Sequence, residues 1–289
     1  MSATAASPGR PAKGTRARRR RRLTIVRAVV AALITLLFMG PIAWMVSTAL
    51  KVGNQAFSET PTIFFSPTFD NFRSVFTKSQ FGDALATSLF TATSSTILAL
   101  VLGAGIAYPL ARVKIRGSQH LAFWVLSLRI IPPIAVIIPM FLMLRSFHLT
   151  GSVWSLVVIY TFMNLPLTVW LLRGFFADLP TEIEEASFVD GASRLRSFFG
   201  ITVPLAMPGI VATALLAFIF AWNEFLFANI LTGADTRTAP VGLTEYVTPT
   251  SVEWTNIMAA GTLVVLPVWI GALAAQRYLV RGLTMGAVK

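Results

Sequence analysis

Six long apolar segments dominate this sequence and indicate that the chain lies in a lipid bilayer. Each is about 20 residues or longer, which lets a helix with a rise of ~1.5 Å per residue cross the ~30 Å hydrocarbon core of a bilayer. The segments are 23–45, 85–110, 120–144, 153–176, 207–231 and 257–280. Backbone N–H and C=O groups must be paired within lipid, so each segment is predicted to be helical. The expected fold class is an all-α membrane protein with six transmembrane helices.

The charge content agrees with a membrane environment. Only 12% of the 289 residues are Asp, Glu, Lys or Arg, about half the share found in an average soluble domain. The chain contains no cysteine, which excludes disulfides and thiolate metal sites. The two histidines, His120 and His148, are too far apart in sequence to form a metal-ligand motif, and we expect them at the ends of spans. Neither a metal nor a cofactor is predicted.

The first 22 residues form a basic tail that contains eight of the 24 Lys and Arg residues. A basic run directly before an apolar span is typical of a cytoplasmic topology signal that meets anionic lipid head groups. We expect this tail to be disordered. A nucleic-acid-binding arm is the alternative, but no aromatic or RNA-binding signature accompanies the basic run, so nucleic acid is not an expected partner. The apolar run that follows exceeds the 7–15-residue core of a signal peptide, so it is expected to be a retained first span.

The placement of Lys and Arg predicts the orientation of the chain in the membrane. With the N-terminus inside, the cytoplasmic segments hold 18 Lys and Arg residues and the opposite side holds five. Positive residues favour the cytoplasmic side, so both termini are predicted to be cytoplasmic. The expected organisation is the tail 1–22 followed by one transmembrane domain, 23–289, with a cytoplasmic loop at about 177–206 and a cytoplasmic C-terminal tail at 281–289.

The cytoplasmic loop contains the densest segment of mixed charge in the chain. The charged side chains of this segment are Glu182, Glu184, Glu185, Asp190, Arg194 and Arg196. Pro180 suits the start of a helix, acidic residues suit its N-terminal dipole, and Gly191 suits a left-handed turn at its end. We therefore predict a short helix, a glycine turn and a second short helix. Paired carboxylates can act in acid–base catalysis, but no nucleophile–histidine pair or phosphate-binding loop accompanies them, so the charges indicate a docking surface.

The spacing of this loop resembles the EAA loop of ABC importer permeases. Glu185-Ala186-Ser187, Asp190-Gly191-Ala192, Phe198 and Pro204 follow the pattern E-A-A-x-x-D-G-A-x-x-x-x-x-F-x-x-x-x-x-P, with Ser187 in place of the second alanine. The segments 220–224 (FAWNE) and 276–289 are similar to those of the maltose-type permeases of carbohydrate importers. The resemblance covers nearly the whole chain from about residue 23 onward.

This resemblance implies a type I ABC importer permease fold and a non-catalytic permease subunit of the bacterial cytoplasmic membrane. Such a subunit forms half of the translocation pathway for a sugar, oligosaccharide or polyol. The implied partners are a second permease subunit of a different chain, two ATPase subunits that hydrolyse ATP, and an external solute-binding protein. The loop residues implied to couple to the ATPase are Glu182, Glu185, Ala186, Asp190, Gly191, Ala192, Phe198 and Pro204. The implied C-terminal contacts to the ATPase are Gly282, Leu283, Thr284, Gly286 and Lys289.

Polar groups within the apolar segments are candidates for the translocation pathway, because ionisable side chains are costly in a membrane. Arg129 lies near the middle of the third span, and the prolines at 132 and 133 predict a kink there with free carbonyls facing a cavity. Asn164 lies at a similar depth on the fourth span, with Tyr160 one turn away. The fifth span contributes three candidates, Trp222, Asn223 and Glu224. Together they offer the mixture of aromatic and polar side chains that a polyhydroxyl solute needs.

Several alternatives remain open at the level of sequence. Helix–helix contact competes with solute binding for Asn223 and Glu224, and it is the preferred interpretation for Trp222. Arg129 is expected to be structural or gating. A direct ion pair with Glu224 would require tilted spans or a snorkelling Arg129 side chain, because the two residues differ in depth by about 10 Å. A stand-alone ion-coupled secondary transporter is the competing function, although such proteins usually show internal repeats and several intramembrane acids. A membrane-embedded enzyme or scaffold is the third hypothesis.

Overall fold

The computed structural model describes residues 13–56, 62–77, 79–113, 115–249 and 251–286. Within these ranges the regular structure is helical apart from one isolated antiparallel bridge between Val247 and Val252. The prediction of an all-α protein is confirmed. Four helices are long and apolar enough to cross a membrane by themselves: α1 (Lys13–Ala49), α4 (Phe81–Arg112), α7 (Val153–Ala177) and α14 (Trp254–Gly286).

Two further candidate spans are built from helices that meet at a sharp bend. The first pair is α5 (Ser118–Ser127) with its 3₁₀ extension η1 (Leu128–Ile130), followed by α6 (Pro133–Ser146) at an angle of 88°. The second pair is Arg194–Leu205 and α11 (Met207–Trp222), which meet at 76°. With each bent pair counted as one span, the candidate spans number up to six.

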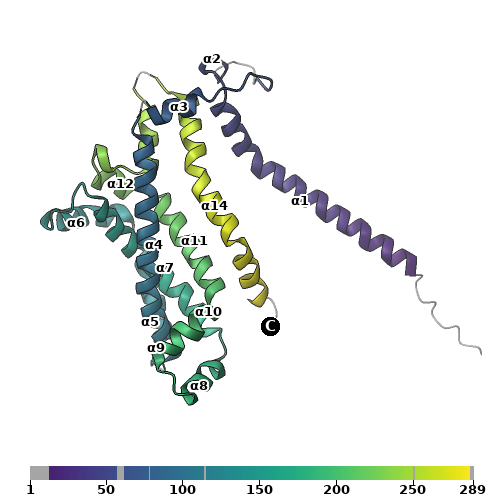
Figure 1. The fold of residues 1–289 in the computed structure, drawn as a ribbon, viewed down its shortest axis with the longest axis vertical. Coiled ribbons are helices and arrows are strands. Elements are labelled where there is room, and N and C mark those ends of the chain that lie inside the picture. Colours follow the sequence, from purple (N-terminus) through teal and green to yellow (C-terminus); the bar gives the residue numbers. More distant parts are fainter. Residues whose placement is uncertain (1–12, 57–61, 78, 114, 250, 287–289) are drawn as a thin grey trace, which may run out of the picture.

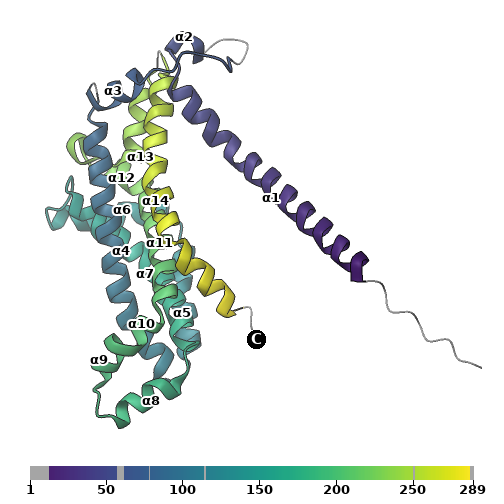
Figure 2. The same ribbon diagram turned by 45° about the vertical axis from the view of Figure 1, so that its right-hand side comes forward.

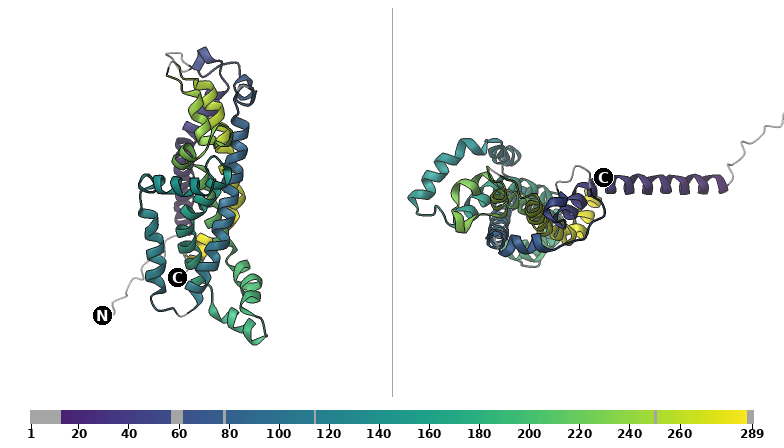
Figure 3. Two further views of the ribbon diagram at one scale, coloured as in Figure 1. Left: turned by 90° about the vertical axis from the view of Figure 1, so that its left-hand side faces the viewer. Right: turned by 90° about the horizontal axis from the view of Figure 1, so that it is seen from above.

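The predicted kink in the third span is confirmed and is a near right angle. Ile131 and Pro132 have extended backbones with ψ of 122° and 128°. Two successive prolines cannot donate backbone hydrogen bonds to the preceding turn, so the helix cannot continue through them. As a result α6 lies across the long axis of the bundle (Figures 1 and 3).

The prediction of a continuous fifth span over 207–231 is wrong. The helix α11 ends at Trp222, and after a short break α12 (Leu226–Leu231) begins. The Glu224 carboxylate accepts hydrogen bonds from the backbone N–H groups of Phe227 at 2.9 Å and Ala228 at 3.1 Å. A side chain that satisfies the first N–H groups of a helix favours a new helix start. The break therefore has a local cause in Glu224.

Helix α4 packs along α7 and α11 (Figure 1). Its buried face consists mainly of small residues, including Ala92, Ser95, Ala99, Gly103 and Ala107. Small residues let helix backbones approach closely, which is the main source of attraction between helices in lipid. One close approach is at Gly103, where an added Cβ would lie 2.6 Å from Thr168 Cγ2 on α7.

Substituting alanine at two glycines of α4 is expected to have opposite effects on stability. Gly103→Ala should destabilise the protein by about 1–3 kcal/mol, because the new methyl group overpacks the contact with Thr168. Gly105→Ala is the matched control, since nothing lies within 4 Å of its added Cβ and alanine favours a helix by up to ~1 kcal/mol. Thermal unfolding midpoints of the detergent-purified variants will test this. Equal midpoints would show that the α4–α7 contact is looser than described.

Helix α1 leaves the bundle and projects away from it (Figures 1, 2 and 3). It contacts α14, yet the most apolar window of its 23–49 span is 0% buried. The helix begins at Lys13, so the expectation that residues 1–22 are a disordered tail is wrong for 13–22. Lys, Arg and Ala are strong helix formers and extend a helix that the membrane span has already nucleated. Residues 1–12 lie outside the described ranges.

The two ends of the bundle carry different elements (Figure 2). One end holds α2 (Gly53–Ala56) and the short amphipathic helix α3 (Asp70–Thr77). The short elements η3 (Ala234–Thr236), α13 (Ala239–Gly242) and η4 (Leu243–Tyr246) precede α14. The opposite end holds the loop at about 177–206. Helix α14 runs to Gly286, so most of the predicted tail 281–289 is helical, whereas Lys289 lies outside the described residues.

Candidate functional site

The predicted helix–glycine–helix turn is present at one end of the bundle. It consists of α8 (Thr181–Val189), α9 (Arg194–Ser197), the π-helical segment η2 (Phe198–Thr202) and α10 (Val203–Leu205). Gly191 separates the two halves with a φ of 82°, which confirms the predicted left-handed turn. The second half starts at Arg194, because Ser193 caps it by accepting a hydrogen bond from the Arg196 N–H at 3.3 Å.

This turn is inverted with respect to polarity. Its buried side chains are polar: Glu184, Ser187, Ser197 and Thr202. Beside exposed charges such as Glu182, Glu185 and Arg194, its exposed side chains include the large apolar residues Ile183, Phe188, Val189, Leu195 and Phe199, of which Val189 is 88% exposed. A solvated surface helix normally has the reverse arrangement. An exposed apolar patch of this kind marks an interaction site.

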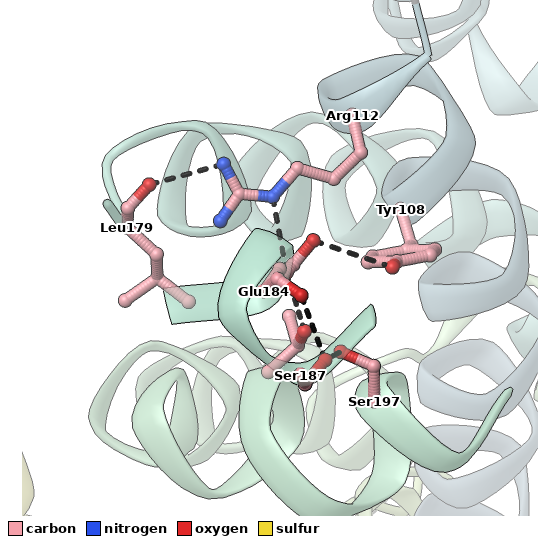
Figure 4. A network of polar contacts seen from close by, with 7 residues as sticks. Tyr108, Arg112, Leu179, Glu184, Ser187 and Ser197 are labelled. Carbon is pink, nitrogen blue, oxygen red and sulfur yellow. Dashed lines mark hydrogen bonds and ion pairs between the residues drawn. The ribbon is translucent and has the colours of Figure 1, made fainter. Parts of the chain in front are cut away.

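A buried polar cluster holds the turn against the bundle (Figure 4). The Glu184 carboxylate forms an ion pair with Arg112 Nε at 3.1 Å, and both side chains are less than a tenth exposed. It also accepts hydrogen bonds from Thr202 Oγ1 at 2.5 Å and from the Tyr108 hydroxyl at 3.4 Å. We call these four residues the Glu184 cluster. Because they come from α4, α8 and η2, the cluster joins three elements.

Two contacts extend the Glu184 cluster. Arg112 Nη1 donates to the backbone carbonyl of Leu179 at 3.0 Å, just after the end of α7. Ser187 Oγ donates to Ser197 Oγ at 2.9 Å and so ties α8 to α9. The sequence interpretation grouped Glu184 with the exposed docking charges, and this is wrong because Glu184 points inward to Arg112. No periodicity within the loop could have shown this, since the partner lies 72 residues earlier in the chain.

The loop residues expected to couple to a partner fall into two groups. Glu182, Glu185, Ala186, Asp190, Gly191 and Pro204 are exposed, and Ala192 is partly buried. Phe198 instead packs inward, with its ring centroid 4.7 Å from that of Tyr108 and 6.0 Å from that of Phe176. The structure therefore places Phe198 where it anchors the turn, and leaves the acidic residues and the tip accessible.

A second candidate site is a cavity of about 630 Å³ beside the two helix breaks. Four of the residues singled out from the sequence line it together: Arg129, Tyr160, Asn164 and Glu224. The remaining wall is mainly apolar and includes Phe162, Met163, Phe220 and Phe227. The breaks after Ile130 and Trp222 bring residues from α5–α6, α7 and α11–α12 to one place. A mostly apolar cavity with a few convergent polar groups is a typical small-molecule site.

The two charges of this cavity have different neighbours. The Arg129 guanidinium lies over the Phe220 ring, 4.1 Å from its centroid, and Nη1 is 3.5 Å from the Met163 carbonyl. Glu224 caps α12, as described above. Among the described side chains, the ion pairs are those of Arg112 with Glu184 and of Arg237 with Glu245. Arg129 and Glu224 therefore share a cavity without forming the direct ion pair that the sequence left open.

The other two candidates from the fifth span lie outside the cavity wall. Trp222 is buried, stacks on Phe218 and donates from Nε1 to the Val264 carbonyl at 3.1 Å. The preference for packing at Trp222 agrees with these contacts. Asn223, directly after α11, is exposed and its side chain donates to the Ile219 carbonyl of that helix at 2.8 Å. Asn164 lines the cavity but also donates to the Ala217 carbonyl at 3.1 Å, so it bonds α7 to α11.

Removing the Glu224 carboxylate is expected to loosen the α12 start. Glu224→Ala should cost about 1–2 kcal/mol of stability, which is typical for loss of a helix-capping side chain. Glu224→Gln keeps one carbonyl acceptor and should cost clearly less. The thermal unfolding midpoints of the purified variants will show the ranking. Glu253→Ala is the control, because Glu253 is exposed and its carboxylate bonds to the side chain of Asn256 on the surface. A midpoint for Glu224→Ala equal to the control would contradict the capping role.

Comparison with known proteins adds independent information. The family model described as "Binding-protein-dependent transport system inner membrane component" matches residues 95–285. The chain is 37% identical over 256 residues to the "Probable ABC transporter permease protein y4oR" of Sinorhizobium fredii, covering 89% of this chain and 92% of that protein. It is 36% identical over 270 residues to the "Trehalose transport system permease protein SugB" of Mycobacterium tuberculosis, covering 91% and 98%.

The fold also matches a solved structure. A chain of the bacterial ABC transporter "involved in the import of the acidic polysaccharide alginate" superposes with a TM-score of 0.71 at 23% sequence identity. The match covers 91% of this chain and 98% of that chain. At this identity the similarity concerns the fold alone.

Proposed function

The chain belongs to the family of binding-protein-dependent transport system inner membrane components, and from that premise we propose how it works within an importer. The permease is proposed to form half of the pathway for a sugar, oligosaccharide or polyol. ATP hydrolysis is assigned to a separate ATPase subunit, to which the 182–204 turn couples. The non-catalytic role of the permease itself accords with its family.

The observation that carries this proposal is the inverted polarity of the α8–α10 turn. Five exposed apolar side chains at the end of the bundle need a protein partner to exclude water from them. The adjacent exposed acids Glu182, Glu185 and Asp190 would set its orientation, because charges around an interface give specificity more than affinity. We assign this surface to the ATPase and place it, with both termini, on the cytoplasmic side, in line with the Lys and Arg distribution.

The solute class is proposed from the cavity. Arg129, Tyr160, Asn164 and Glu224 supply polar groups, while Phe220 and Phe227 supply flat apolar faces. Sugars present both hydroxyl groups and C–H surfaces, so such a mixture suits them. The trehalose permease named above is a relative with nearly full coverage, which supports a carbohydrate.

A second permease subunit is proposed because α1 projects from the helix bundle and leaves its apolar side chains uncovered. Its apolar side chains are exposed along most of its length, for example Leu33, Leu36, Leu37 and Phe38. A partner chain beside α1, together with lipid, would cover them. A solute-binding protein is proposed to dock at the opposite end, which carries α2 and α3. The C-terminal residues Gly282, Leu283, Thr284, Gly286 and Lys289 are proposed to reach the ATPase from α14.

The test is purification of the tagged chain from its native membrane in mild detergent, with mass spectrometry of all retained proteins. We expect an ATPase with a P-loop and a second permease chain. The double variant Glu185→Arg/Val189→Asp should lose the ATPase and keep the second permease. Asp178→Arg is the matched control, since Asp178 is an exposed acid outside the turn surface. A homo-oligomer without an ATPase would overturn the proposal and favour a stand-alone transporter.

A further inference from the structure

We propose that the Glu184 cluster is a fixed joint that makes the α8–α10 turn and α4 move as one body. In this view Glu184 is a positioning residue, whereas its neighbour Glu185 faces the partner. The inference rests on the proposed function, because it concerns how movement of an ATPase would reach the membrane helices.

The two adjacent glutamates of α8 are in opposite environments. Glu184 is 6% exposed, and Glu185 is an exposed residue. Consecutive residues of a helix point about 100° apart, so one can enter the bundle while the next faces outward. The same acidic pair thus divides into an internal attachment and an external surface. This division separates the role of Glu184 from that of every exposed charge of the turn.

The internal attachment is rigid because its groups are both charged and buried. A buried ion pair tolerates little displacement, since separation leaves an uncompensated charge in an apolar setting. Glu184 is satisfied at the same time by Arg112 at 3.1 Å and Tyr108 at 3.4 Å (Figure 4). It also accepts a hydrogen bond from Thr202 at 2.5 Å. These three donors come from α4 and η2, so they restrain the carboxylate from two elements at once. The α8 backbone therefore cannot shift against α4 without breaking several of these bonds.

Apolar contacts strengthen the same attachment from a second side. The rings of Tyr108, Phe176 and Phe198 pack against one another with centroid distances between 4.7 and 6.1 Å. They come from α4, α7 and η2 respectively. Tyr108 belongs to both the aromatic group and the Glu184 cluster. The turn is thus fixed to α4 through both the ring and the hydroxyl of Tyr108.

The position of Arg112 determines what the joint would move. Arg112 lies in the last turn of α4, the helix that packs along both α7 and α11. Helix α7 carries Tyr160 and Asn164 of the cavity wall. A displacement of the turn would therefore be passed to α4 as a whole, and from its packed face to the helices that line the cavity. The proposal needs only this rigid connection and no specific chain of side chains beyond it.

The test is a spin-label distance across the joint in the complete transporter. The chain has no cysteine, so Arg196→Cys on α9 and Ile97→Cys on the exposed face of α4 provide unique labelling sites, with cysteines of the partner chains replaced by serine. The α4 segment from 97 to 112 spans about 22 Å, which suits pulsed electron paramagnetic resonance. Distances are recorded without nucleotide and after trapping with ATP and vanadate. The parent should give the same distance in both states.

Breaking the cluster should uncouple the two labels. We expect Glu184→Gln to shift the distance by about 5 Å on trapping, of the order of one helical turn. Thr202→Val removes one hydrogen bond while preserving shape, and should broaden the distribution even if Glu184→Gln does not assemble. Asp178→Asn removes an exposed acid and should match the parent. A parent distance that shifts on trapping, or variants that match the parent, would overturn the joint. The amount of ATPase retained by the parent sample is measured separately. Absence of the ATPase would overturn the proposed function, whereas the label distances test only the joint.

Discussion

Replacing Gly191 by valine is expected to reduce the amount of ATPase retained by the chain at least tenfold. Gly191 has a φ of 82°, and a β-branched side chain in this left-handed region costs roughly 2 kcal/mol. Nothing lies within 4 Å of an added Cβ, so the cost is one of backbone conformation and not of packing. About 1.4 kcal/mol corresponds to a factor of ten in an equilibrium. The turn would therefore adopt another conformation and misplace α9 relative to α8.

The measurement is the molar ratio of ATPase to permease after mild-detergent purification. Gly191→Asn is the decisive companion, because asparagine is among the few residues with a side chain that tolerate the left-handed conformation. It should retain most of the ATPase. Equal loss in the Gly191→Val and Gly191→Asn variants would show that the glycine itself, and not its conformation, is required. Membrane insertion should be normal in both, since the spans are unchanged.

Reversing the charge of Arg112 is expected to remove nearly all folded protein. Arg112→Glu would set a second buried carboxylate against Glu184 in place of its ion-pair partner at 3.1 Å. Removing one partner of a buried ion pair costs about 3–5 kcal/mol, and charge reversal adds repulsion. Native proteins are stable by only about 5–15 kcal/mol, so this is a large fraction of the total. The yield of monodisperse protein by fluorescence-detected size exclusion is the measurement.

The rescue is the more informative half of this experiment. Arg112→Glu/Glu184→Arg restores opposite charges, and the Tyr108 and Thr202 hydroxyls can accept hydrogen bonds from a guanidinium as well as donate. We expect at least partial recovery of yield in the double variant. The control is Arg116→Glu, which changes an exposed arginine four residues after the end of α4. This variant should give the same yield as the parent. If the double variant were no better than Arg112→Glu alone, the ion pair would not be what stabilises this region.

The features that the sequence predicted correctly depend on local properties. The spans at α4 and α7 follow from long apolar runs, which need no knowledge of neighbours. The bend after Ile130 follows from the missing N–H groups of Pro132 and Pro133. The left-handed turn follows from Gly191, because glycine adopts positive φ without steric cost.

The features that sequence interpretation missed depend on residues far apart in the chain or on competing local bonds. The apolar run 207–231 suggests one helix, but the Glu224 carboxylate caps a new helix inside it. The basic residues at 13–22 suggest a disordered tail, but they continue α1. Glu184 resembles a surface charge, and its burial depends on Arg112, 72 positions earlier. In each case hydropathy alone gave no sign of the partner or continuation.

The sequence by itself determined the fold class of this protein and the location of the α8–α10 turn. Apolar length fixes helices in lipid because backbone groups must be paired there, and the spacing around Gly191 fixes a turn because only certain residues accept that backbone. The tertiary structure alone decided which polar side chains line the cavity and which are buried against one another. It gathers Arg129, Tyr160, Asn164 and Glu224 around one cavity and places Glu184 beside Arg112. A buried charge is stable only where another element supplies its partner, and that partner is known only once the helices have packed.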